Sequence, residues 1–130
     1  MAQKILLDTC AFLWWVRDDA ALSGKARELI LNPENSVFLS SVSVWEITVK
    51  HGLGKLPLAD LPHIYIPTER KKHEIESLPL TEKAVLHLKS LPQHHKDPFD
   101  RMLICQAIEH DLTILTGDGL IVQYPVNTAW

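Results

Sequence analysis

Short apolar runs alternate with amphipathic segments along the whole chain, and this alternation constrains the fold more than any other feature. Strands are predicted at residues 4–7, 36–40, 76–80 and 112–115, with one further edge strand in the tail YPVNTAW. Helical patterns separate them, at residues 9–16, 23–31, 43–52, 60–73, 81–91 and 98–110. Strands that alternate with helices form parallel sheets covered on both faces, connected by right-handed crossovers. We therefore expect an α/β fold with a central, mostly parallel sheet flanked by helices.

Two of these segments have less regular patterns. Pro62 and Pro67 interrupt the segment 60–73, which predicts one or two short helices there. Thr81 is a suitable N-cap for the helix of residues 81–91, which is expected to stop at Pro92.

Size and composition favour one packed domain spanning residues 1–130, because 46% of the residues are apolar and 22% are charged. The net charge of −3 argues against a nonspecific nucleic-acid coat, so any nucleic acid must be held locally. Cys10 and Cys105 lack CxxC spacing, which suits a reducing compartment. No uninterrupted apolar run approaches about 18 residues, so we expect a cytoplasmic protein without a membrane span.

Four acidic residues are predicted to meet at one edge of the sheet. Asp8 closes the first strand, and Asp118 follows the strand LTIL in the turn TGDG. Glu46 is expected in the first turn of the helix after the second strand, and Asp100 in the first turn of the helix that leads into LTIL. Ligands of parallel sheets bind at the carboxyl ends of the strands, where helix N-termini also gather.

Each acid alone also has an ordinary structural explanation. Asp8 and Asp97 can cap the helices that follow them. Glu46 can form a capping box with Ser43 or an ion pair with Lys50 one turn later. Asp118 can be an ordinary turn residue, and the helix dipole favours an acid at the position of Asp100.

Taken together, the four carboxylates need a further explanation. Carboxylates that converge repel one another, and their pKa values rise unless a cation intervenes. Ligation by carboxylates alone suits a hard ion such as Mg²⁺ or Mn²⁺, whereas zinc prefers nitrogen or sulfur. Such ions can activate water and stabilise a leaving oxygen in phosphodiester hydrolysis.

Four segments in this order resemble the motifs of PIN-domain nucleases: LLDTCAFLWW, SVSVWEI, HHKDPFDRMLICQA and LTGD. The DPFDR segment and the YP…W tail are similar to the VapC-like toxin branch. The resemblance spans almost the whole chain and implies a PIN-like three-layer fold. It also implies that a catalytic quartet binds Mg²⁺ or Mn²⁺, formed by Asp8, Glu46, Asp100 and Asp118. Three further residues are expected near the metal or the substrate, namely Asp97, Arg101 and Thr116.

The same resemblance implies an activity and partners. It implies endonucleolytic cleavage of RNA, with water as nucleophile and a 3′-hydroxyl leaving group, by the toxin of a type II toxin–antitoxin pair. It also implies a cognate antitoxin and a homodimer. Trp14 and Trp15 point about 100° apart on a helix, so they can either be partly buried or form an aromatic patch for an antitoxin segment.

Other functions fit the sequence less well. An aspartyl-phosphate phosphatase with Asp8 as nucleophile needs a second Asp at the position of Cys10. A phosphate-binding module is disfavoured because GxGxxG and GxxxxGK[ST] loops are absent from the sequence. A catalytically silent PIN-like adaptor for RNA or protein would not need all four acids. His94, His95 and Lys96 are interpreted as a solvated polar loop, with phosphate contact as the alternative.

Overall fold

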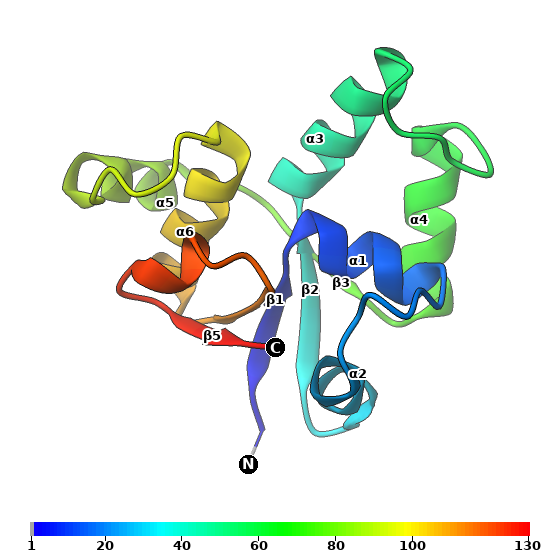
Figure 1. Ribbon diagram of the computed structural model, residues 1–130, viewed down its shortest axis with the longest axis horizontal. Helices are drawn as coiled ribbons and strands as arrows, with labels where there is room; N and C mark the ends of the chain where they lie inside the picture. Colours follow the sequence, from blue (N-terminus) through cyan, green and yellow to red (C-terminus); the bar gives the residue numbers. More distant parts are fainter. Residues whose placement is uncertain (1) are drawn as a thin grey trace.

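A parallel sheet forms the centre of the computed structural model, which describes residues 2–130 (Figure 1). Its strands are β1 (Lys4–Leu7), β2 (Ser36–Ser40), β3 (Glu76–Leu78), β4 (Thr113–Leu115) and β5 (Asn127–Ala129). They lie in the order β3-β2-β1-β4-β5, and every neighbouring pair is parallel. The α/β prediction is confirmed, and the tail adds the expected edge strand.

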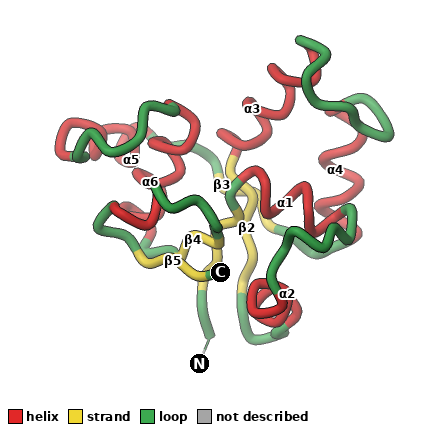
Figure 2. Tube along the Cα trace, in the orientation of Figure 1, coloured by secondary structure: helices red, strands yellow, loops and turns green. Residues whose placement is uncertain are grey.

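Helices cover both faces of this sheet. They are α1 (Thr9–Val16), α2 (Gly24–Leu31), α3 (Ser41–Gly52), α4 (Pro62–Lys72), α5 (Glu82–Val85) and α6 (Pro98–His110), with 3-10 turns at Leu86–Ser90 and Ile121–Gln123. Helices α1 to α4 lie on one side of the strands, and α5 and α6 lie on the other (Figure 2). Among the described residues, none of these helices is both long and apolar enough to cross a membrane.

Alternate residues of the central strand β1 enter two separate cores. Ile5 and Leu7 pack with Phe12 of α1, whereas Leu6 packs with Leu103 and Ile104 of α6. All six side chains are fully buried. A strand buried on both faces reads as a continuous apolar run, which explains why KILL has no polar alternation after Lys4.

The start of α3 differs from the prediction. Ser40, the last residue of β2, is the N-cap: its Oγ accepts a hydrogen bond from the Val42 N–H and donates one to Gln106 in α6. Ser43 is not the cap but is buried inside the helix. Glu46 therefore lies in the second turn of α3, and the predicted capping box does not form.

Two other segments also differ in detail. The segment 60–73 forms one helix, α4, with Pro67 inside it, because buried Tyr65 and Ile66 anchor the turn that Pro67 weakens. The helix capped by Thr81 becomes 3-10 from Leu86 onward. Strand β3 is shorter than expected and ends before Pro79, which has no N–H for the ladder.

Candidate active site

The carboxyl ends of three neighbouring strands and the start of α6 meet at one edge of the sheet. Leu7 of β1 is in register with Leu39 of β2 and with Leu115 of β4. Asp8 therefore lies beside Thr116, and Asp118 follows in the same turn. Asp100 reaches this edge from the first turn of α6.

These elements enclose a cleft of about 440 Å³. Acidic side chains dominate its lining: Asp8, Glu46, Asp97, Asp100 and Asp118. The other lining residues are Thr9, Cys10, Trp14, Ala21, Lys50, Gly117 and Trp130. All four acids of the predicted quartet thus face one cleft, although they come from four separate segments.

Asp8 is buried, and backbone and side-chain donors hold its carboxylate. Its Oδ1 accepts a hydrogen bond from the Ala11 N–H at 2.7 Å, so Asp8 caps α1 as one interpretation predicted. Burial raises the pKa of Asp8, and hydrogen bonds from Thr116 and Ala11 oppose that rise. The charges of Asp118 and Glu46 raise the same pKa further. Capping and a place in the cleft are therefore compatible roles.

Glu46 is buried and engaged on both of its oxygens. Its Oε1 accepts a hydrogen bond from the Thr9 hydroxyl at 2.7 Å, and Thr9 Oγ1 also lies 2.9 Å from Ser43 Oγ. Its Oε2 pairs with Lys50 Nζ one turn along α3, as the spacing predicted. The Thr9 contact links the starts of α1 and α3, so it fixes where Glu46 enters the cleft.

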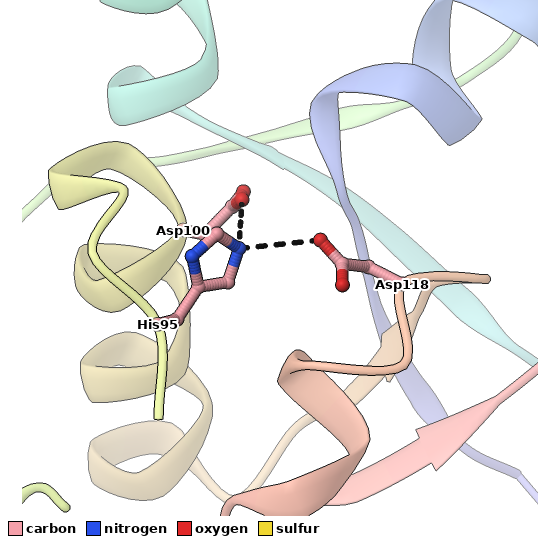
Figure 3. A group of neighbouring side chains, drawn as sticks. All are labelled: His95, Asp100 and Asp118. Atoms are coloured by element: carbon pink, nitrogen blue, oxygen red, sulfur yellow. Dashed lines mark hydrogen bonds and ion pairs between the residues drawn. The ribbon is translucent and has the colours of Figure 1, made fainter. Parts of the chain in front are cut away.

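Asp100 and Asp118 lie close together, with the ring of His95 against both (Figure 3). His95 Nε2 is 3.0 Å from Asp100 Oδ2 and 3.2 Å from Asp118 Oδ2. The three side chains place one ligand-type atom each within 4.8 Å of one another. His95 is largely buried, so the interpretation of this residue as part of a solvated loop is wrong, whereas His94 and Lys96 are exposed.

Asp97 and Arg101 shape the start of α6. Asp97 is the N-cap, and its Oδ1 accepts hydrogen bonds from the N–H groups of Phe99 and Asp100 at 2.8 and 3.2 Å. Arg101 Nη1 donates to the carbonyl of Pro92 at 3.1 Å and lies within hydrogen-bond distance of the Tyr124 hydroxyl. In this conformation Arg101 holds the loop before α6 and contacts none of the cleft carboxylates among the described residues.

Acidic groups outnumber basic ones in the lining of the cleft, and they shift the pKa values of their neighbours. Burial raises the pKa of Asp100 to about 7, with further upward contributions from the charges of Asp97 and Glu46. Burial and the charges of Asp8, Glu46 and Asp100 raise the pKa of the Cys10 thiol to about 11. Cys10 lines the cleft rather than filling the core.

An aromatic wall borders the acids. Trp14 and Trp130 both line the cleft, with ring centroids 5.8 Å apart. Trp130 packs directly over Gly117, where an added Cβ would lie only 2.9 Å from the indole ring. Trp15 points elsewhere, with its ring edge against His73. The two adjacent tryptophans thus face different surroundings, and both are half-buried.

The donor set fits a hard divalent ion. Carboxylate oxygens predominate in the cleft, and burial, followed by the charges of neighbouring acids, raises the pKa values of Asp8 and Asp100. A cation placed among such groups is stabilised by every carboxylate that it neutralises. Asp8, Asp100 and Asp118, with Glu46 deeper in α3, are the residues that would hold it.

Comparison with known proteins identifies the family. Residues 5–126 match the family described as the PIN domain. The chain belongs to the PIN-domain family. No curated protein sequence matches it.

Solved structures share the fold of this PIN domain. VapBC2 from Rickettsia felis, bound to a DNA fragment from its promoter, has a TM-score of 0.71 at 14% identity, and the match covers 98% of both chains. DNA-bound VapBC from Salmonella typhimurium has a TM-score of 0.68 at 20% identity, covering 98% of this chain and 97% of the other. FitAcB from Neisseria gonorrhoeae has a TM-score of 0.58 at 22% identity, covering 95% of both chains.

Three residues in or beside the cleft of the PIN domain, His95, Thr9 and Trp130, were not assigned to the site from the sequence. His95 lies two positions before the helix cap Asp97, and this closeness to the DPFD segment was the available signal. Thr9 directly follows the predicted Asp8, and this adjacency was its signal. Trp130 was noted only as the end of the YP…W tail; its place beside the acids depends on the β4–β5 pairing, which brings the tail back over Gly117.

The metal-free PIN domain is expected to lose stability as pH rises. The folded-state pKa of Asp100 is raised from 3.8 to about 7, so the folded protein holds this proton more tightly than the unfolded chain does. That contribution is complete below about pH 4 and is lost as pH rises through about 7. We expect the melting temperature in EDTA to fall between about pH 4 and 7.

Two variants control this measurement. Asp100→Asn should flatten the decline, whereas Asp111→Asn, at an exposed position after α6, should keep the wild-type slope. A melting temperature that stays level or rises across the same range in the wild type would contradict the assignment.

Proposed function

We propose that this PIN domain is a metal-dependent endoribonuclease and the toxin of a VapBC-like toxin–antitoxin pair. The observation that carries the proposal is the convergence of Asp8, Glu46, Asp100 and Asp118 on one cleft from four segments of the chain. Core packing does not require this convergence, since each carboxylate raises the cost of ionising its neighbours. A Mg²⁺ or Mn²⁺ ion and a phosphodiester explain why such a cost is tolerated.

The ion, when bound, would supply an activated water molecule and stabilise the departing 3′ oxygen. The chain's own residues position the carboxylates for this task. The Ala11 N–H and the Thr116 hydroxyl orient Asp8, and the Thr9 hydroxyl orients Glu46. Asp100 lies in the first turn of α6, and Asp97 is the N-cap of that helix. Carboxylates held by helix starts and strand ends need little rearrangement when the ion and the substrate arrive.

Cleavage of RNA is tested with a labelled single-stranded RNA and a DNA oligonucleotide of the same sequence, each with Mn²⁺. We expect internal cuts in the RNA only, with 5′-phosphate and 3′-hydroxyl ends. RNA binding without any cleavage in Mg²⁺ or Mn²⁺ would instead support the silent adaptor. Cleavage of the DNA at an equal rate would contradict the ribonuclease assignment.

The proposal includes an antitoxin partner and a homodimer. The fold shared with chains of VapBC and FitAcB structures supports the antitoxin partner, and the homodimer rests on the family resemblance of the sequence. Light scattering of the purified protein tests the homodimer, which should have twice the mass of the 14.8 kDa chain. A monomer at every accessible concentration would rule the homodimer out.

We expect the antitoxin to contact α1 at Trp14 or at Trp15, which face different surroundings, because amphipathic segments bind grooves through a few buried aromatic anchors. Trp14→Ala or Trp15→Ala should weaken the complex by about 2 kcal/mol, or ~30-fold in Kd. The complex is obtained by co-expression with the adjacent reading frame, and affinity is measured by calorimetry. Val122→Ala, exposed on the opposite side of the sheet, is the control. If both tryptophan variants bind normally, the contact lies elsewhere.

A further inference from the structure

His95 makes contacts that the predicted quartet does not explain. Its Nε2 lies between Asp100 Oδ2 and Asp118 Oδ2, two carboxylates from different segments (Figure 3). Asp118 is 23 residues away along the chain. The three atoms lie within 4.8 Å of one another, so the hydrogen bonds of the ring decide whether His95 is itself a ligand or supports the two carboxylates.

The hydrogen-bond network identifies which ring nitrogen carries the proton. The backbone N–H of Asp97 donates to His95 Nδ1 at 3.2 Å, so Nδ1 must present its lone pair. In a neutral imidazole the proton then resides on Nε2, which donates toward both carboxylates. A metal-ligating histidine has the opposite arrangement, because it gives its lone pair to the ion and donates its other N–H to a neighbour. His95 is therefore a donor to the acids and not a ligand.

The backbone around His95 is held on two sides. Its N–H donates to the Tyr124 hydroxyl at 2.8 Å, and Arg101 Nη1 donates to its carbonyl oxygen at 3.4 Å. The neighbouring His94 ring packs edge-on against the Tyr124 ring. These contacts fix the direction of the imidazole before any ion binds. A residue that orients metal ligands without binding the ion itself must be fixed in this way.

We propose that His95 is a positioning residue, whose Nε2–H holds Asp100 and Asp118 in the arrangement that receives the divalent ion. The inference rests on the proposed function for the identity of the site. By engaging Oδ2 of both residues, the imidazole N–H offsets part of their mutual repulsion and leaves other lone pairs for the ion. The chain thus supplies a fixed bridge between α6 and the turn after β4.

The test measures Mn²⁺ binding by electron paramagnetic resonance in two variants of similar size. His95→Gln can place an amide N–H where Nε2 lies, whereas His95→Asn is one carbon shorter and cannot reach both carboxylates. We expect His95→Asn to weaken Mn²⁺ affinity by about tenfold or more, as is common for groups that orient metal ligands, and His95→Gln to recover most of it. His63→Gln, at an exposed histidine of α4 outside the cleft, should bind like the wild type. Circular dichroism establishes that each variant is folded.

The outcomes separate this inference from the proposed function. Equal Mn²⁺ affinity in the wild type and His95→Asn, or tighter binding in the variant, would overturn the positioning role while leaving the metal site intact. Directly coupled imidazole nitrogen in the electron spin echo of bound Mn²⁺ would show that His95 is a ligand, which also overturns it. If the wild type binds no Mn²⁺, the metal site itself fails, and the role of His95 fails with it.

Discussion

Replacing Asp100 by asparagine is expected to lower kcat/KM for RNA cleavage by about 100-fold or more while the protein stays folded. The substitution keeps the size of the side chain but removes one charge from the site that would bind the ion. A metal contributes several kcal/mol to transition-state stabilisation, and about 1.4 kcal/mol corresponds to a tenfold change in rate. Because burial already raises the pKa of Asp100 to about 7, the neutral amide should not destabilise the fold.

Asp97→Asn provides the matched comparison three residues earlier. Asp97 also lines the cleft, but its Oδ1 caps α6 through the N–H groups of Phe99 and Asp100. Asparagine caps a helix nearly as well as aspartate, so cleavage should fall less than in Asp100→Asn. Asp111→Asn, outside the cleft, should leave cleavage unchanged. A reversed order of the first two effects would make Asp97 the direct ligand.

Removing divalent ions is expected to abolish cleavage completely. The cleft offers mainly hard oxygen donors, so EDTA should stop the reaction, Mg²⁺ or Mn²⁺ should restore it, and zinc alone should restore little. The measurement is the rate of RNA cleavage after dialysis against EDTA and after addition of each ion. Undiminished cleavage in EDTA would be decisive evidence against a metal-dependent mechanism.

The same ions should raise the melting temperature. An ion present at 100 times its Kd stabilises the folded state by about 2.7 kcal/mol, which corresponds to roughly 10 °C for a domain of this size. Asp100→Asn should reduce this rise, and Asp111→Asn should retain it. A melting temperature that millimolar Mg²⁺ and Mn²⁺ both leave unchanged would show that the acids do not form a metal site.

The sequence alone determined the fold class and the edge of the sheet, at the carboxyl ends of its strands, where the acids gather. Apolar runs such as KILL and SVFLS predict buried parallel strands, and β1 and β2 have the predicted bounds. The carboxyl ends of parallel strands necessarily share one edge, so Asp8, which directly follows a strand, and Asp118, in the turn after one, are placed without knowledge of packing. The cap Asp97 was also predictable, because capping depends on neighbours within one helical turn.

Only the tertiary structure decided the contacts between those segments. The fit of β2 against α6 made Ser40 the cap of α3, through its hydrogen bond to Gln106, and moved Glu46 to the second turn. The bridge from His95 to Asp118 and the packing of Trp130 over Gly117 likewise join segments that are distant in sequence. Periodicity and capping report interactions within a few residues, whereas these contacts depend on how whole elements pack. For that reason the acids could be found by reading the chain, and the histidine that holds two of them could not.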